Sequence, residues 1–161
     1  MMPMKFNYDI KLEDNSKSVK QLLTETVHNI LDQWGMLVMS YAKKLAGRHV
    51  DTSRLMNSIT YVVNDAEKNV TIGTNAQSDS GTWPNGYEAQ PSPYPIYVEL
   101  GTGIYAEKGD GRKEPWYWYD MKTKQWHFTR GVPPRPFLRP AVEDHINELR
   151  EIAVEEGNKE I

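Results

Sequence analysis

Apolar residues recur every three or four positions over residues 16–46, and this spacing predicts one long helix. Gly47 is a natural stop, and Ser18 and Gln21 have the spacing of a capping box at the start, where Asp14, Asn15 and Ser16 are further capping residues. Such a helix is about 45 Å long at 1.5 Å per residue, more than a small domain needs for its own core. Part of it is therefore expected to project or to pack on a neighbour.

Glycine at position 35 interrupts this helical stretch and costs about 1 kcal/mol relative to alanine. We expect either a kink or a close helix contact at Gly35. The apolar stripe itself comprises Val19, Leu23, Val27, Ile30, Trp34, Leu37, Tyr41 and Leu45, widened by Leu22, Leu31, Val38 and Ala42.

The next segments predict a first hairpin and then a long loop. Residues 51–58 begin with capping residues and favour a helical turn, residues 59–63 and 70–74 read as strands, and residues 64–69 have turn chemistry. Residues 75–93 show little apolar periodicity and contain several Gly and Pro residues, so they are expected to form a loop. Trp83 and Tyr87 give that loop something to bury against a partner.

A second hairpin is predicted between residues 116 and 129, around a turn at residues 120–124. Alternation places Trp116 and Trp118 on one face and Tyr117 and Tyr119 on the other. Aromatic surface on both faces implies that something outside the hairpin covers one of them. These four residues, with Trp83 and Tyr87, are the candidate assembly interface.

Prolines at 133, 134, 136 and 140 predict a stiff extended arm that ends at a last helix, from about Pro140 to about Glu156. The arm displays Arg135, Phe137, Leu138 and Arg139, which suits either docking to a partner or aiming the last helix. The apolar stripe of that helix is Val142, Ile146, Leu149, Ile152 and Ala153.

The chain of 161 residues fits a single domain over 1–161, with an N-terminal extension over 1–13 and a C-terminal tail over 157–161. It contains no cysteine, which excludes disulfides and thiolate chemistry and suits a reducing compartment. Without a signal-like or membrane-spanning apolar run, cytoplasmic synthesis is expected.

Charge is distributed unevenly around a net value of -3. Residues 108–139 contain eight basic and three acidic side chains, a balance of +5, whereas residues 141–161 contain seven acidic and two basic ones, a balance of -5. Complementary patches permit head-to-tail contacts between copies, which close into a ring when the rotation allows. The alternative is a pair of solvated faces.

Signatures of enzymes, cofactor sites and metal sites are not found. The glycine pairs at 101/103 and 109/111 lack the further residues of a phosphate-binding loop and read as turns. The histidines at 28, 49, 127 and 145 share no metal-ligand spacing, and His145 beside Asp144 is expected to be solvated on a helix surface. We therefore predict no catalytic residues, no cofactor and no metal.

Nucleic-acid binding is an alternative for the basic aromatic segment 108–139, because aromatic rings on strands can stack on bases while arginines contact phosphates. Tryptophans and tyrosines alternating on a hairpin are more typical of core on one side and a protein interface on the other. Direct nucleic-acid binding is therefore the less favoured interpretation.

Four short pieces of the sequence form a pattern when they are taken together: residues 51–59 (DTSRLMNSI), 94–102 (YPIYVELGT), 126–131 (WHFTRG) and 136–141 (PFLRPA). In this order and approximate spacing they resemble the HK97 gp10-like family of tailed-phage and prophage proteins, and the resemblance covers roughly residues 20–155. Ser53 is a departure, because the family usually has glycine there. The loop over 75–93 also looks expanded.

The resemblance implies an α+β domain in which a long N-terminal helix and a C-terminal helix pack on a mainly antiparallel β-sheet built from two hairpins. It also implies a non-catalytic virion protein of the head-tail junction or tail (a tail-completion, terminator or neck component), made in the bacterial host cytoplasm. Such a protein would assemble as a ring, expected to be a hexamer, against head connector, tail-tube or terminator proteins, with no membrane involved.

Within the matched pieces, Glu99 is expected to pair with Arg135, Arg139 or Arg54 and so to tie the proline arm to the sheet. Gly101 and Gly103 would let the chain turn immediately afterwards. The structural motif therefore comprises Glu99, Gly101, Thr102, Arg135, Phe137, Arg139 and Pro140. Its expected role is a junction that fixes the last helix, which leaves partner contacts to the aromatic hairpin, the loop around Trp83 and the first helix.

Overall fold

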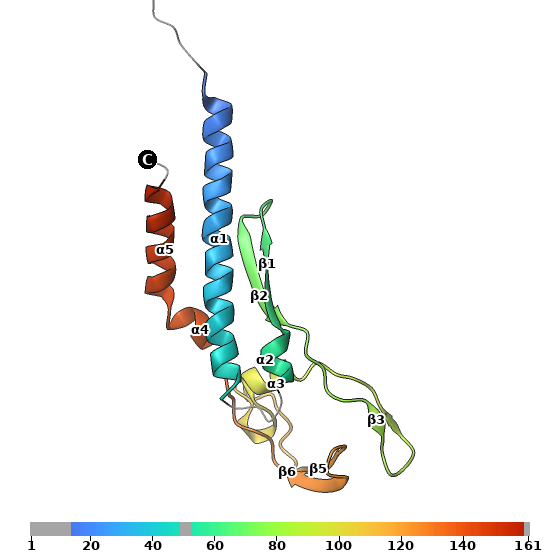
Figure 1. Ribbon diagram of the computed structural model, residues 1–161. Coiled ribbons are helices and arrows are strands. Elements are labelled where there is room, and N and C mark those ends of the chain that lie inside the picture. Colours follow the sequence, from blue (N-terminus) through green and yellow to red (C-terminus); the bar gives the residue numbers. More distant parts are fainter. Residues whose placement is uncertain (1–13, 49–52, 160–161) are drawn as a thin grey trace, which may run out of the picture.

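A computed structural model describes residues 14–48 and 53–159 as an elongated molecule built along one long helix. Helix α1 (Ser16–Ala46) is the central element, with the hairpin β1 (Ile59–Asn64) and β2 (Asn69–Thr74) on one side and helix α5 (Ile146–Asn158) on the other (Figure 1). The short helices α2 (Arg54–Ser58), α3 (Pro95–Leu100) and α4 (Arg139–Glu143) gather near the C-terminal end of α1. A 3₁₀ turn, η1 (Gly103–Tyr105), follows α3.

The strands of the described residues form three separate antiparallel pairs. In β1–β2, Tyr61 lies opposite Ile72. Strands β5 (Trp116–Asp120) and β6 (Gln125–Thr129) pair with Trp118 opposite His127, and β3 (Gly81–Thr82) pairs with β4 (Glu88–Ala89). The β3–β4 and β5–β6 hairpins lie beyond the C-terminal end of α1 (Figure 1).

The predicted α+β class is confirmed, with the long N-terminal helix, the C-terminal helix and both predicted antiparallel hairpins. The arrangement differs in two details. The two hairpins do not join into one sheet, and α5 packs against α1, whereas α1 packs on β1–β2. In the described part of the chain, no helix combines the length and the apolar run that crossing a membrane requires.

Helix α1 has the predicted bounds, but the predicted capping box does not form. The helix begins at Ser16, so Ser18 is already inside the first turn, and Gln21 donates its side-chain hydrogen bond to Glu25. The Ser16 N–H instead donates to Asp14 Oδ1 at 3.0 Å. The first turns are bare, with Val19 and Leu23 more than half exposed, which agrees with the expectation that part of this helix projects.

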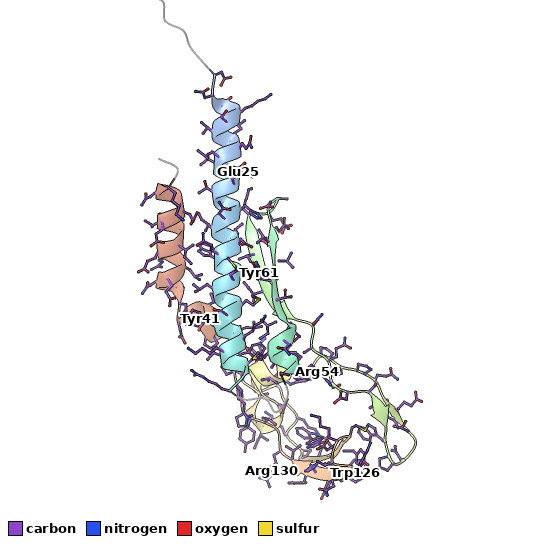
Figure 2. The ribbon with its side chains drawn as sticks, in the orientation of Figure 1. Glu25, Tyr41, Arg54, Tyr61, Trp126 and Arg130 are labelled. Carbon is purple, nitrogen blue, oxygen red and sulfur yellow. The ribbon has the colours of Figure 1, made fainter. Side chains whose placement is uncertain are left out.

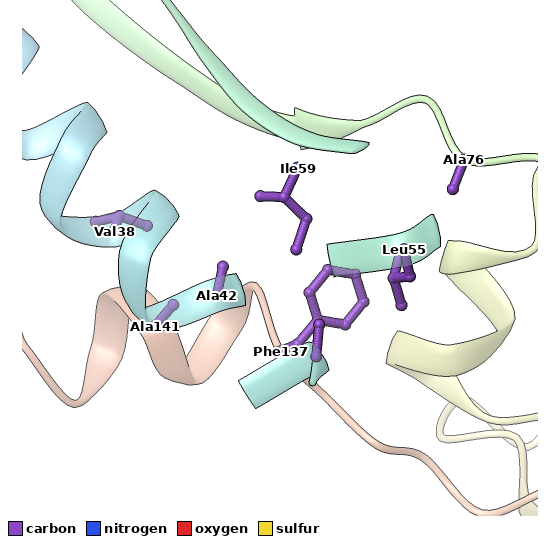
Figure 3. Packing of buried hydrophobic residues seen from close by; sticks show 8 residues of the cluster. Val38, Ala42, Leu55, Ile59, Ala76, Phe137 and Ala141 are labelled. Atoms are coloured by element: carbon purple, nitrogen blue, oxygen red, sulfur yellow. The ribbon is translucent and has the colours of Figure 1, made fainter. Parts of the chain in front are cut away.

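The small core lies around the C-terminal half of α1 (Figure 3). Val38, Ala42 and Ala46 of α1 meet residues that come from α2, the start of β1, the segment after β2, the proline arm and α4: Leu55, Ile59, Ala76, Phe137 and Ala141. Phe137, 1% exposed, is among the largest fully buried side chains. The proline arm thus contributes a central core residue.

Two tyrosines fix the layers on either side of α1 (Figure 2). The hydroxyl of Tyr61, on β1, donates to Asp32 Oδ1 at 2.8 Å, and the hydroxyl of Tyr41, on α1, donates to Glu148 Oε2 at 3.0 Å. Because the neutral phenol is the donor, each of these bonds raises the pKa of its tyrosine. These contacts hold the first hairpin and α5 against the central helix.

Two predicted segments differ from the structure. The loop over residues 75–93 contains the short β3–β4 hairpin, closed by the Trp83 N–H to Tyr87 carbonyl bond of 2.8 Å around a glycine at φ +83°. The prediction of a single last helix is wrong, because the helix is interrupted at Asp144 and His145, between α4 and α5. As a result Val142 and Ile146 of the predicted stripe are exposed.

Candidate functional site

Glu99 is buried and accepts hydrogen bonds from three successive backbone N–H groups of the proline arm. Its Oε2 accepts from Phe137 at 2.7 Å and Leu138 at 3.0 Å, and its Oε1 accepts from Arg139 at 3.1 Å. These donors precede or begin α4 and have no helical partner of their own, so the carboxylate satisfies them as a cap. Glu99 therefore joins α3 to the start of α4.

Arg139 is one of the three arginines proposed for Glu99, and the structure places its Nε 3.6 Å from Glu99 Oε1. The Arg139 guanidinium also forms two hydrogen bonds of 2.7 Å with the Glu107 carboxylate. That pairing lowers the pKa of Glu107 and raises the pKa of Arg139. Arg54 pairs instead with Asp79 at 2.6 Å, which ties α2 to the segment after β2.

The segment around Gly101–Gly103 lies directly against the proline arm. The Thr102 N–H donates to the Val132 carbonyl, and the Val132 N–H donates to the Thr102 hydroxyl, both at 2.9 Å. Gly103 has φ +61°, and a Cβ there would lie closer than 3.0 Å to the backbone of Arg130. The backbone at Gly103 and the backbone at Arg130 thus approach each other more closely than a side chain at position 103 would permit.

The arm itself continues this attachment. The Arg135 N–H donates to the Val98 carbonyl at 2.8 Å, Phe137 enters the core, and Pro140 lies in the first turn of α4. Gly101, at φ +73°, packs against Pro134. The motif residues are therefore engaged within the chain, and the arm has the geometry of a junction between α3 and α4.

The β5–β6 hairpin carries four aromatic side chains on one face, which we call the aromatic face: Tyr117, Tyr119, Trp126 and Phe128. Tyr117 is paired with Phe128 and Tyr119 with Trp126 across the strands, each with ring centroids 5.3 Å apart. Tyr117 and Phe128 are 66% and 57% exposed, which is unusual for large rings. The face is formed but largely uncovered.

Sequence reasoning placed Tyr117 and Tyr119 together but did not include Trp126 or Phe128 in the interface. The sequence does contain a signal for these two rings. Residues 125–129 alternate on the return strand, and the turn at 120–124 sets the register that brings the rings opposite the tyrosines. Trp116 and Trp118 lie on the opposite face, as predicted, where Trp118 stacks on His127 at 5.0 Å.

The β3–β4 hairpin contacts the second hairpin through Trp83. The Trp83 ring meets the Trp126 ring edge to face at 5.6 Å, and Tyr87 packs against Trp83 at 6.1 Å. Trp126 nevertheless remains half exposed, at the lower end of the molecule in Figure 2. The structure therefore brings Trp83, Tyr87 and the aromatic face into one cluster.

A cavity of about 680 Å³ lies between α3 and the loop that leads to β5. Ile96 and Tyr97 of α3 line it, together with Trp116, and the Arg112 guanidinium lies 5.5 Å from the Trp116 ring centre. That distance suits a cation–π contact. The cavity offers an apolar surface with a cation at its edge.

Histidines and carboxylates do not assemble into a metal site within residues 14–48 and 53–159. His28 pairs with Asp65 at 2.8 Å and joins α1 to the turn of the first hairpin. The solvated surface position predicted for His145 is wrong, because its ring stacks on Tyr41 with centroids 3.3 Å apart. His49 lies outside the described residues.

The charged segments fall in different parts of the molecule. The basic segment 108–139 includes the β5–β6 hairpin, and the acidic segment includes α5, beside α1 (Figure 1). Some of these charges are used inside the chain, since Arg139 binds Glu107 and Lys159 binds Glu156. A head-to-tail contact between copies through the remaining charges stays a prediction.

No protein-family model, curated protein or solved structure matches this chain in comparisons of sequence and structure.

Proposed function

We propose that this chain is a non-catalytic structural subunit of a tailed-phage or prophage particle, located at the head-tail junction or in the tail. The resemblance of the four sequence pieces supplies this role and its setting: a virion protein made in the bacterial host cytoplasm. Tail completion, termination of the tail and a neck position are all within the proposal. Its neighbours would be head connector, tail-tube or tail-terminator proteins.

The observation that carries the self-assembly part of the proposal is the presence of bare apolar surface at both ends of the molecule. At one end, Val19 and Leu23 of α1 are 51% and 59% exposed. At the other end, beyond the end of α1, lies the largely uncovered aromatic face. Exposed apolar surface of this kind marks protein contacts, and two different patches on one subunit suit a ring. The resemblance to the family leads us to expect that this ring is a hexamer.

The junction that Glu99 forms between α3 and α4 also supports the proposed self-assembly. The proline arm is engaged by α3 and by the core through Glu99, Thr102 and Phe137. A rigid middle of this kind would hold the two apolar ends at a fixed distance and angle. Fixed geometry is what a closed ring requires of its subunit.

Purified chain, measured by size-exclusion chromatography with light scattering over a range of concentrations, is expected to form discrete oligomers. Electron microscopy of particles that contain the protein, with antibody labelling, is expected to place it at the neck or tail. A chain that stays monomeric at high concentration and is absent from purified particles would refute the proposal.

Nucleic-acid binding through residues 108–139 is the alternative, and the cation over Trp116 favours it. The aromatic face argues against it, because its four strand positions carry rings without lysine or arginine among them. Stacking platforms for nucleic acid combine rings with cations. Affinity for single-stranded DNA that falls steeply as salt rises would support this alternative, and no binding at low salt would exclude it.

A further inference from the structure

The aromatic face lacks a cover in the described part of the chain. Among residues 14–48 and 53–159, the β5–β6 sheet contains two strands, and neither of its outer edges is paired with a further strand. Trp83 reaches Trp126, whereas Tyr117 and Phe128 remain more than half exposed. Isolated two-stranded hairpins are marginally stable in water, and a third strand with an apolar face is the usual remedy. The hairpin is therefore suited to accept one more strand.

A segment with the sequence of such a strand precedes α1. Residues 4–13 alternate without interruption between apolar and polar types, with the apolar ones being Met4, Phe6, Tyr8, Ile10 and Leu12 and the polar ones Lys5, Asn7, Asp9, Lys11 and Glu13. Strict alternation over this length is typical of a strand with one apolar face. These residues lie outside the described ranges, and the alternation is a property of the sequence alone.

We propose that residues 4–12 of one copy add as a third strand to the β5–β6 sheet of a second copy. Their apolar side chains then cover the aromatic face, while main-chain hydrogen bonds satisfy one open edge. This proposal rests on the proposed self-assembly and names the two surfaces that carry it. We call residues 4–12 the donor segment and the aromatic face with its edge the acceptor.

The donor segment cannot reach the acceptor of its own chain. Helix α1 contains 31 residues and is therefore about 45 Å long. The donor segment joins its N-terminal end, whereas the β5–β6 hairpin lies beyond its C-terminal end (Figure 1). With residues 4–12 on the hairpin, only residues 13–15 remain to bridge that length, and three residues span at most about 11 Å when fully extended. The partner must be a second copy.

Donor and acceptor at opposite ends of one rigid subunit define a head-to-tail contact. Such a contact repeats from copy to copy, and it closes into a ring when the rotation between subunits permits. Val19 and Leu23, which are exposed in the first turns of α1, lie seven and eleven positions after the donor segment in the sequence, so the proposed contact would also bring them near the same neighbour. The contact therefore explains both bare ends of the molecule at once.

Three full-length variants test the contact by light scattering. The donor variant carries Phe6→Asp and Ile10→Asp, and its charge-matched control carries Asn7→Asp and Lys11→Gln on the polar face. The acceptor variant carries Tyr117→Ser and Phe128→Ser. We expect the donor and acceptor variants to assemble at least about tenfold more weakly than the unaltered chain, and the control to assemble normally.

Mixing the donor and acceptor variants gives the sharper result. Such a mixture contains one intact acceptor and one intact donor, so it is expected to form a 1:1 dimer that cannot grow further. Hydrogen exchange should then show slower exchange of amides in residues 4–12 of the acceptor variant. Dimer formation also demonstrates that both variants are folded.

Two results overturn the inference while leaving the proposed function intact. One is that the unaltered chain assembles and the donor variant, measured separately, assembles equally strongly. The other is a mixture that stays monomeric although each variant alone is a folded monomer, because the intact donor segment and the intact acceptor would then have failed to bind each other. An unaltered chain that is monomeric at every concentration instead refutes the self-assembly and this contact together.

Discussion

Gly35 of α1 lies directly under the ring of Tyr61, so that a Cβ at position 35 would come closer than 3.0 Å to three ring carbons. The expected close contact is therefore present, but its partner is a strand residue of β1. The Tyr61 hydroxyl donates to Asp32 on the same helix, which keeps the ring from moving away. The glycine and the tyrosine together set how closely the first hairpin approaches α1.

Gly35→Ala is therefore expected to destabilise the protein although alanine favours helix. Forcing a methyl group into a packed contact costs typically 1–3 kcal/mol, so even after a helix-propensity gain of about 1 kcal/mol we expect a net loss of up to about 2 kcal/mol. Urea unfolding followed by circular dichroism measures the change. Gly157→Ala is the matched control, because α5 leaves open space at that position, and it should be neutral or stabilising.

Glu99→Gln is expected to weaken the junction between α3 and α4. The carboxylate offers two acceptor oxygens to three N–H groups, whereas an amide offers one oxygen and turns an NH₂ group toward a donor. The loss of bonds to a charged acceptor is expected to lower the free energy of unfolding by about 1.5–3 kcal/mol. Glu107→Gln, which removes a half-exposed partner of Arg139, should change stability little. Equal urea midpoints for the two variants would contradict the assigned role of Glu99.

Local sequence patterns were sufficient for the elements whose formation depends on their own residues. The apolar stripe and Gly47 predicted α1 from Ser16 to Ala46, and alternating residues around turn chemistry predicted both β1–β2 and β5–β6. The break at Asp144 and His145 could not be predicted in this way. It lets α5 lie along α1, where the Trp34 indole N–H donates to the Leu149 carbonyl at 2.7 Å, a contact between residues 115 positions apart.

The candidate site shows the same division. Pairing of Glu99 with an arginine was predicted from charge, but its three bonds to backbone N–H groups were not, because those groups are nearly forty positions away and carry no sequence signature. Contact between Trp83 and Trp126 likewise depends on how two hairpins meet beyond the end of α1. Tertiary packing determines both.

The turn of the β5–β6 hairpin should lose stability in acid. Asp120 accepts hydrogen bonds from the Lys122 N–H at 2.8 Å and the Thr123 hydroxyl at 2.9 Å, and the pKa of Asp120 is lowered, first by the Lys122 bond. Because its folded pKa lies below the unfolded one, the stability it contributes is present above the ordinary value of 3.8 and is lost as pH falls through the folded pKa. Tryptophan fluorescence should report a loss of hairpin structure as the pH falls through the folded pKa of Asp120. Asp120→Asn should remove that part of the acid dependence, and an unchanged difference between the variant and the unaltered chain across this pH range would contradict it.

Trp83→Ala is expected to detach the β3–β4 hairpin from the aromatic face without unfolding the core. Trp83 meets Trp126 and Tyr87, whereas the core residues lie around α1, α2 and Phe137. Hydrogen exchange should therefore become faster in residues 81–89, while α1 keeps its protection. Trp118→Ala is the control, because Trp118 lies on the opposite face of β5 beside His127 and should leave exchange in residues 81–89 unchanged. If the aromatic face is the contact surface, Trp83→Ala should also weaken assembly, since it removes the ring that orients Trp126. Loss of protection throughout α1 would instead show that Trp83 stabilises the whole fold.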